Sequence, residues 1–452
     1  ASGVFNVTYE MEQALAGARV ALSRVQHLMP QAAARERARR LFAASGALGV
    51  DPVNPYARRV SAPLPPGRPR NVVVVVMESF TGRLIGAMGG ELALSPEFDA
   101  LSREGLLLTH CYATGERTVQ GLEAVLSSFP PLPGVSVVRR PESQTGFATL
   151  ASLLGARGYD TLFLYGGQGI FDNMRSFFLG NGFRAFIEER DFPDPAFRGS
   201  WGVSDGDVFH RANREFQQRW EAGRPFLGAI LTVSLHSPWE FPRGGVPELP
   251  PGTPVPEGFE RDELANFLYA DYALGEFMRE ARGLPYFADT VFVFVGDHGV
   301  HLRGRELLPS EEYRVASLIL APGLLQPGRL EGVTSQLDLA PTILGLVGGE
   351  FVSPFFGADV RTRDAQDALA ILVYDKRHYG ARRADRLTVL SARGGRTAYR
   401  VEGGQLSPSA LEPAHQADAD DALALLQVAE ELLERRQYSV PEAPAGARQA
   451  RD

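Results

Sequence analysis

Five consecutive valines, Val72 to Val76, lie within an apolar segment at residues 71–77. β-Branched side chains favour extended backbone. An apolar run with no polar alternation is typical of a strand that is buried on both faces, as in a parallel sheet covered by helices on each side. Residues 290–295 have the same character. The chain is therefore expected to contain an α/β domain.

Strand-like and helix-like segments alternate between and around these two runs. Further strand candidates are residues 161–165, 226–234 and 316–320. Helical patterns occur at residues 96–104, 119–126, 149–156, 207–222, 261–280 and 337–346. Such alternation predicts a mostly parallel sheet. In these sheets ligands bind beyond the carboxyl ends of the strands, which is where functional residues are expected.

The two ends of the chain differ from the middle in their sequence pattern. Residues 1–69 are expected to form an N-terminal helical stalk, with helices at 9–29 and 32–44, followed by a Pro-rich linker. These helices either pack against the main body or lead to a segment upstream. The catalytic domain is expected at residues 70–365. A small C-terminal α+β subdomain is expected at residues 366–440, ahead of a disordered tail at 441–452.

The composition excludes several classes of protein. The net charge of −8 argues against nucleic acid as a partner. A single cysteine, Cys111, excludes an internal disulfide and a cysteine-based zinc cluster, and is expected to be an ordinary buried thiol. The longest apolar run, residues 368–374, is far shorter than a membrane span.

Charged residues follow both of the strongest strand candidates. Glu78 comes directly after the valine run, and Asp297 and His298 follow the second strand through Gly296. Buried charges are costly without partners, and a metal ion is a natural partner for carboxylates and imidazole. At either position alone, the alternative is a carboxylate that caps the next helix. The two positions together favour a metal site.

Thr118 is the candidate nucleophile. It lies where a helix should begin, after a turn at Gly115. A helix N-terminus favours anions, and a metal would lower the pKa of a hydroxyl enough to make an alkoxide nucleophile. The alternative is that Thr118 is only a helix N-cap.

Several segments resemble the alkaline phosphatase and sulfatase superfamily, namely residues 71–79, 95–105, 296–299 and 338–344. Residues 114–123 (TGERTVQGLE) more specifically resemble the lipoteichoic acid synthase type of phosphoglycerol transferase. This resemblance covers roughly residues 70–350. It implies a three-layer sandwich with a mostly parallel central sheet and a small C-terminal α+β subdomain.

The resemblance also implies a single-metal site. Glu78, Thr118, Asp297 and His298 match its ligands, with manganese as the usual metal and magnesium or zinc as alternatives. Thr118 is then the nucleophile. The sulfatase motif, Cys or Ser followed by x-Pro-x-Arg, is absent after Cys111, and the extra ligands of a two-zinc phosphatase are not recognisable.

A histidine segment after residues 226–234 supplies a second catalytic candidate. His236 resembles the histidine of the family's His-x-Pro segment and could protonate a leaving group or bind a phosphoryl oxygen. The alternative is a histidine that caps a strand end. The expected substrate-binding residues are Arg117, Phe171, Asp172, Asn173, Trp201, Asp205, His236 and His301. Gram-positive-type synthases have Trp and Arg where Asp172 and Met174 stand, which leaves the head group open.

The implied activity is transfer of a glycerol-phosphate head group from phosphatidylglycerol to a glycan or polymer hydroxyl, through a phospho-threonine intermediate. The expected location is a membrane surface on the periplasmic side, with transmembrane helices upstream of this chain. Alternatives are a phosphoethanolamine transferase, which usually carries several disulfides, and a phosphodiesterase or phosphonate hydrolase with water as acceptor. A non-catalytic binding protein on the same fold is the alternative from another class.

Overall fold

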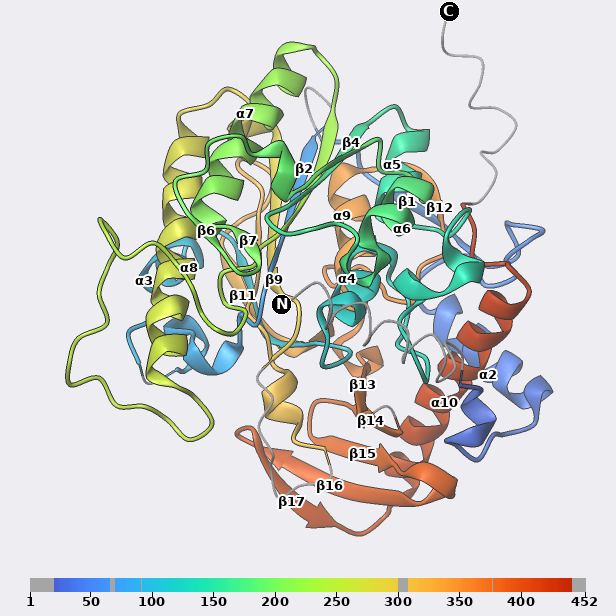
Figure 1. The fold of residues 1–452 in the computed structure, drawn as a ribbon. Helices are drawn as coiled ribbons and strands as arrows, with labels where there is room; N and C mark the ends of the chain where they lie inside the picture. Colours follow the sequence, from blue (N-terminus) through green and yellow to red (C-terminus); the bar gives the residue numbers. More distant parts are fainter. Residues whose placement is uncertain (1–19, 66–69, 91, 300–307, 376, 441–452) are drawn as a thin grey trace, which may run out of the picture.

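The computed structural model describes residues 20–440 except 66–69, 91, 300–307 and 376. Its centre is an eight-stranded sheet in the order β11-β3-β10-β9-β2-β8-β4-β5 (Figure 1). Neighbouring strands pair in parallel except at β10, which is antiparallel to both β3 and β9. The strands are β2 (Asn71–Met77), β3 (Leu106–Tyr112), β4 (Asp160–Tyr165), β5 (Ala185–Ile187), β8 (Phe226–Leu231), β9 (Thr290–Gly296), β10 (Ser317–Leu320) and β11 (Gly328–Ser335).

The valine run of β2 divides its side chains between two cores. Val72 and Val74 belong to one apolar cluster and Val73 and Val75 to another, and all four are fully buried. Helices cover both faces of the sheet (Figure 1). One layer contains α4 (Thr118–Ser127), α5 (Leu150–Ala156), α6 (Met174–Gly180) and α9 (Leu339–Val347); the other contains α3 (Pro96–Leu101), α7 (Asp205–Glu221) and α8 (Arg261–Arg282). The predicted three-layer α/β sandwich is confirmed.

The remaining strands and helices lie outside the central sandwich. β13 (Ala370–Tyr374), β14 (His378–Arg382), β15 (Arg386–Leu390), β16 (Arg396–Glu402) and β17 (Gln405–Ser409) form a five-stranded antiparallel sheet. Helix α10 (Pro413–Glu434) packs on this sheet, as the predicted C-terminal α+β subdomain requires. Two short ribbons pair β1 (Arg58–Ala62) with β12 (Gly349–Ser353), and β6 (Arg198–Gly199) with β7 (Gly202–Val203).

The N-terminal segment differs from the prediction of one helix over residues 9–29. Residues 20–29 contain only a single 3₁₀ turn, Leu22–Arg24, and residues 9–19 lie outside the described part. Tertiary hydrogen bonds replace helical ones here, because the Leu22 amide donates to Glu430 and the Gln26 side chain donates to the carbonyl of Arg377. Helix α2 (Gln31–Ala43) then packs along α10.

Three strands of the eight-stranded sheet escaped prediction, namely β3, β11 and the three-residue β5. β3 carries the polar pair Thr109 and His110, and β11 is an edge strand whose first half is largely exposed, so neither shows an unbroken apolar run. β8 ends at Leu231 rather than at residue 234. The carboxylate of Asp205 accepts the backbone N–H groups of Val233 and Ser234, which ends the ladder there. In the described residues no helix is long and apolar enough to cross a membrane.

Candidate active site

Glu78, Asp297 and His298 meet at the carboxyl edge of the central sheet. Each offers one ligand atom to a group whose atoms lie within 4.8 Å of one another. His298 Nε2 is 3.4 Å from Glu78 Oε1 and 3.6 Å from Asp297 Oδ2. All three are buried, at 5%, 0% and 6% exposure. Because β2 and β9 are parallel neighbours, residues that follow them reach the same place.

Local backbone geometry sets the two carboxylates against each other. Ser79 has a positive φ of 49°, an uncommon conformation for a non-glycine residue, which turns the chain sharply after Glu78. The turn lets the Ser79 amide donate to Asp297 Oδ1 at 2.8 Å and its hydroxyl donate to Glu78 Oε1 at 3.0 Å. Gly121 of α4 touches the backbone of Asp297, where a Cβ would lie 2.3 Å from the carbonyl oxygen. Only glycine allows the helix to come this close.

The charges in this cluster are mutually dependent. Burial pushes the pKa of Glu78 upward, but the hydrogen bond and charge of His298 outweigh it and hold that pKa below its usual range. Burial, and next the charge of Glu78, raise the pKa of Asp297. Burial disfavours the imidazolium, yet Asp297 and Glu78 together raise the pKa of His298 above its ordinary value. Two buried carboxylates thus share one cationic partner.

This donor set fits a divalent cation. Asp297 Oδ2 is fully buried and accepts no hydrogen bond from the described residues, which is costly for a carboxylate oxygen. Two carboxylates and one imidazole form a mixed oxygen and nitrogen set that suits manganese, magnesium or zinc. Glu78, Asp297 and His298 would hold such an ion.

Thr118 adjoins the cluster at the start of α4. Its hydroxyl donates to Glu78 Oε2 at 3.1 Å. The N-cap position of α4 belongs to Arg117, which makes no side-chain cap. Thr118 is therefore the first residue inside the helix, and its hydroxyl is turned to the carboxylate cluster instead of to a backbone amide.

His236 lines a cavity of about 20 Å³ together with Glu78 and Thr118. Its Nδ1 is 2.9 Å from the carbonyl oxygen of Ser237, so this nitrogen donates and Nε2 is left for a ligand. The Trp201 ring lies 3.8 Å from the His236 ring, and its Nε1 donates to the same Ser237 carbonyl at 2.7 Å. Trp201 thus holds the histidine segment from two directions.

The other predicted substrate-binding residues divide into two groups. Phe171 and Trp201 line the cavity, with their rings 5.4 Å apart. Asp172 instead pairs with Arg139, and Asn173 donates to Gln144.

Arg117, Asp205 and His301 also lie outside this cavity or beyond the description. Arg117 is exposed and does not line the cavity. Asp205 is completely buried and holds the loop after β8, upstream of His236, rather than facing the cavity. His301 lies outside the described residues.

Sequence reasoning missed several residues that build the site. Tyr165, Met174 and Thr232 line the cavity, and the Thr232 hydroxyl accepts from the Glu78 amide at 2.9 Å. Gln336 is fully buried and donates to the carbonyls of Gly296 and Asp297, while its own Oε1 accepts from the Thr114 amide. Its position two residues before the family-like segment 338–344 was the available signal.

A mostly parallel three-layer α/β sandwich with this acidic, histidine-bearing edge defines the alkaline phosphatase superfamily. The chain belongs to the sulfatase family, whose sequence pattern matches residues 70–349. A crystal structure of an alkaline phosphatase superfamily protein from Vibrio parahaemolyticus is 32% identical, has a TM-score of 0.84, and matches 93% of this chain and 100% of that one.

More distant relatives carry functional names. The lipoteichoic acid synthase LtaP of Listeria monocytogenes has a TM-score of 0.69 at 20% identity, over 81% of this chain and 93% of that one. The lipoteichoic acid synthase-like YvgJ of Bacillus subtilis is 22% identical over 65% of this chain and 50% of its own length. Phosphoglycerol transferase I of Salmonella typhi is 24% identical over 57% of this chain and 35% of its own length. The chain spans half or less of the length of these two curated relatives.

Proposed function

We propose that this protein is a metal-dependent phosphoglycerol transferase. It moves the glycerol-phosphate head group of phosphatidylglycerol to a hydroxyl of a glycan or of a growing polyglycerol-phosphate polymer. The observation that carries the proposal is the Thr118 hydroxyl, 3.1 Å from Glu78 within the carboxylate and histidine cluster. The names of the relatives support the substrate class.

Before the first step the Thr118 hydroxyl loses its proton to solvent, and the resulting alkoxide attacks the phosphodiester phosphorus. Glu78 accepts the hydrogen bond of this hydroxyl and so orients the oxygen for attack. The bond from Thr118 oxygen to phosphorus forms, and the bond from phosphorus to the diacylglycerol oxygen breaks. The imidazolium of His236, in the same cavity, gives its Nε2 proton to the departing oxygen. A phosphoglycerol ester of Thr118 remains.

In the second step an acceptor hydroxyl attacks the same phosphorus and gives its proton to His236. The phosphorus–oxygen bond to Thr118 breaks and the threonine is regenerated. A divalent ion held by Glu78, Asp297 and His298, which we propose to be manganese, supplies positive charge that favours the threonine alkoxide and the phosphoryl oxygens. Because the donor is a bilayer lipid, we expect the site to work at a membrane surface, on the periplasmic side.

Mass spectrometry tests the proposal directly. The chain is incubated with phosphatidylglycerol and MnCl₂, and the peptide that contains Thr118 is expected to gain one phosphoglycerol. Thr118→Ala should carry no adduct, whereas Thr114→Ala, a neighbouring threonine outside the cluster, should carry it. An adduct on another residue, or turnover by Thr118→Ala, contradicts the nucleophile assignment.

The same experiment separates the alternative activities. A phosphoethanolamine adduct from phosphatidylethanolamine, with none from phosphatidylglycerol, identifies the other transferase. Rapid loss of the adduct to water, without acceleration by a glycan or glycerol-phosphate acceptor, identifies a hydrolase. Manganese binding with no adduct from either lipid favours a non-catalytic binding protein.

A further inference from the structure

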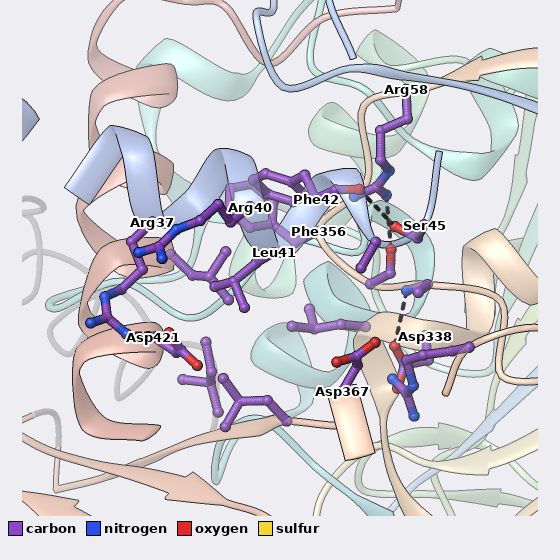
Figure 2. A pocket seen from close by; sticks show the side chains of 18 residues that line it. Arg37, Arg40, Leu41, Phe42, Ser45, Arg58, Asp338, Phe356, Asp367 and Asp421 are labelled. Atoms are coloured by element: carbon purple, nitrogen blue, oxygen red, sulfur yellow. Dashed lines mark hydrogen bonds and ion pairs between the residues drawn. The ribbon is translucent and has the colours of Figure 1, made fainter. Parts of the chain in front are cut away.

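A second cavity, of about 260 Å³, is lined by residues within 37–58, 337–371 and 421–425 (Figure 2). Its walls come from α2, β1, β13 and α10, from the turn before α9, and from the segment between β12 and β13. None of its lining residues lines the cavity that holds Thr118 and His236. Its volume is close to the lower end of the range for small-molecule sites, roughly 300 Å³. It is therefore a separate candidate binding site.

The middle of this cavity is apolar. Figure 2 shows Phe42 and Leu41 of α2 beside Phe356. The Phe42 and Phe356 rings are 5.4 Å apart in an edge-to-face arrangement. Ile371 and Leu425 complete this surface from β13 and α10. A ligand body in contact with it must be apolar.

Arg58 brings a buried positive charge to one end of the cavity. The side chain is 2% exposed, and its Nη2 donates to the carbonyls of Phe355 and Gly357. Its Nε donates to no group in the described chain, its guanidinium carbon lies 5.0 Å from the centroid of the Phe42 ring, and no described carboxylate is within ion-pair distance. A buried guanidinium without a counter-ion is costly, and burial lowers the pKa of Arg58 to about 10.

The remaining charges leave the cavity cationic. Asp338 is paired with Arg363 at 2.8 Å, and Asp421 is paired with Arg37 at 2.7 Å. Arg40, on the rim of the cavity, adds a second arginine with no ion pair among the described residues. The exposed Asp367 is the one lining carboxylate in the described chain that has no arginine partner. Among the described lining residues, two arginines and one carboxylate therefore have no ion pair. This excess of positive charge favours an anionic ligand.

We propose that this cavity is a second ligand site, which binds a small molecule that carries one oxyanion, a carboxylate or a phosphate monoester, on an apolar body. The oxyanion binds at Arg58, at one end of the cavity, and the apolar body lies against Phe42, Phe356 and Leu425 (Figure 2). Since α2 and α10 both line the cavity, a bound ligand contacts the N-terminal segment and the C-terminal subdomain together. It should therefore raise the melting temperature of the whole chain.

The test measures binding of four probes to the full chain by calorimetry and by thermal shift. Octanoate and octyl phosphate, below their micelle concentrations, should each bind saturably and raise the melting temperature. They distinguish a carboxylate ligand from a phosphate ligand. 1-Octanol, which lacks the charge, and inorganic phosphate, which lacks the apolar body, should each bind at least tenfold more weakly.

Variants locate the binding without disturbing Arg58. Arg40→Gln, at an exposed position at the end of the cavity away from Arg58, removes one positive charge without touching the oxyanion and should weaken the charged probes only about twofold. Ala44→Trp, at the exposed C-cap of α2, places a large ring in the cavity and should abolish binding. Arg39→Gln is the matched control, because Arg39 is exposed on the same helix but does not line the cavity.

Four outcomes overturn the proposal. They are absence of saturable binding by both charged probes, equal affinity for 1-octanol, equal affinity for inorganic phosphate, and unchanged binding by Ala44→Trp. Catalytic turnover is not part of the readout, so the result is independent of the activity proposed for Thr118.

Discussion

The two cavities of this molecule are assembled in different ways. The candidate catalytic cavity collects residues at the carboxyl ends of β2, β8 and β4, which are parallel neighbours in one sheet, and the adjoining carboxylate and histidine cluster adds residues that follow β9. The cavity beside Arg58 collects residues from α2 and α10, segments almost 400 positions apart, which meet only by docking. In the first cavity the sheet topology determines which side chains meet. In the second, docking of the chain ends determines it, and no local pattern marks the site.

Asp297→Asn should have the largest effect of the changes predicted here, and it tests the candidate metal site at the edge of the central sheet. Turnover should fall on the order of a thousandfold or more, because a ligand carboxylate is lost. The metal-free protein should become more stable, since the charge that Glu78 repels is gone. Manganese should no longer raise the melting temperature. Turnover assays and thermal melts with and without MnCl₂ measure these three effects.

Asp271→Asn is the matched control for that variant. Asp271 is also fully buried, but it accepts the backbone amides of Glu97 and Phe98 at the start of α3, away from the cluster. It should retain both turnover and the manganese response. A melting temperature of Asp297→Asn that still rises with manganese would remove Asp297 from the metal site.

Glu123 predicts a pH effect on stability that is separate from catalysis. It lies on α4 with Thr118, but it is buried against Ser136 and Val137, both of which donate to Oε2. Burial raises the pKa of Glu123 from 4.5 to about 7. The neutral form is favoured in the folded protein, so this stabilisation is complete below pH 4.5 and is lost as the pH rises through 7.

Glu123→Gln should remove that pH dependence. Between pH 4.5 and 8 the free energy of unfolding of the parent should fall by roughly 3 kcal/mol relative to the variant, because one pKa unit corresponds to about 1.4 kcal/mol. Chemical denaturation at several pH values measures the difference. Glu36→Gln, at an exposed position of α2, serves as control. Parallel pH profiles for the parent and Glu123→Gln contradict the assignment.

The sequence could predict the central sandwich and the catalytic cluster because both depend on strong local signals. The valine run requires burial on two faces, and Glu78, Asp297 and His298 follow directly after such runs. Parallel pairing then brings them together. Thr118 was identified from a short motif; its hydroxyl donates to Glu78, and its role as nucleophile stays a prediction.

The predictions that failed share a physical cause. In each case tertiary contacts outweigh the local sequence pattern. Residues 20–29 have helical spacing, but their amides and side chains bond to α10 and to the C-terminal sheet. Asp205 belongs to a plausible pocket motif, but it does not line the cavity, and its Oδ1 accepts two backbone amides of the β8 loop. The cavity beside Arg58 has no sequence signature, because its walls become neighbours only after the chain ends dock.

Two buried glutamines, one beside the carboxylate cluster and one where the chain ends dock, allow the two regions to be compared. Gln336 joins the Thr114 amide to the backbone of Gly296 and Asp297, whereas Gln427 of α10 joins Met29 to Gln31. Gln336→Ala should lower manganese affinity by about 10–100-fold, because residues that hydrogen-bond to the ligand-bearing backbone orient the metal ligands. Gln427→Ala should leave that affinity unchanged and lower the free energy of unfolding by about 1 kcal/mol. Calorimetric manganese titration and chemical denaturation of both variants measure the contrast. Equal manganese affinities in the two variants would show that Gln336 has only a structural role.

The smallest predicted effect concerns Trp201, which positions His236 through ring contact and through the shared Ser237 carbonyl. Trp201→Phe keeps an aromatic ring but loses the N–H bond, so kcat with phosphatidylglycerol should fall several-fold, by about 1 kcal/mol of barrier. A p-nitrophenyl phosphodiester has a leaving group that needs no proton, and its turnover should be nearly unaffected. His236→Ala should show the same dependence on the leaving group, with larger losses. Equal losses on both substrates would mean that Trp201 contacts the substrate itself and does not act through His236. The comparison of the two substrates therefore shows whether Trp201 contacts the substrate or positions the proton donor.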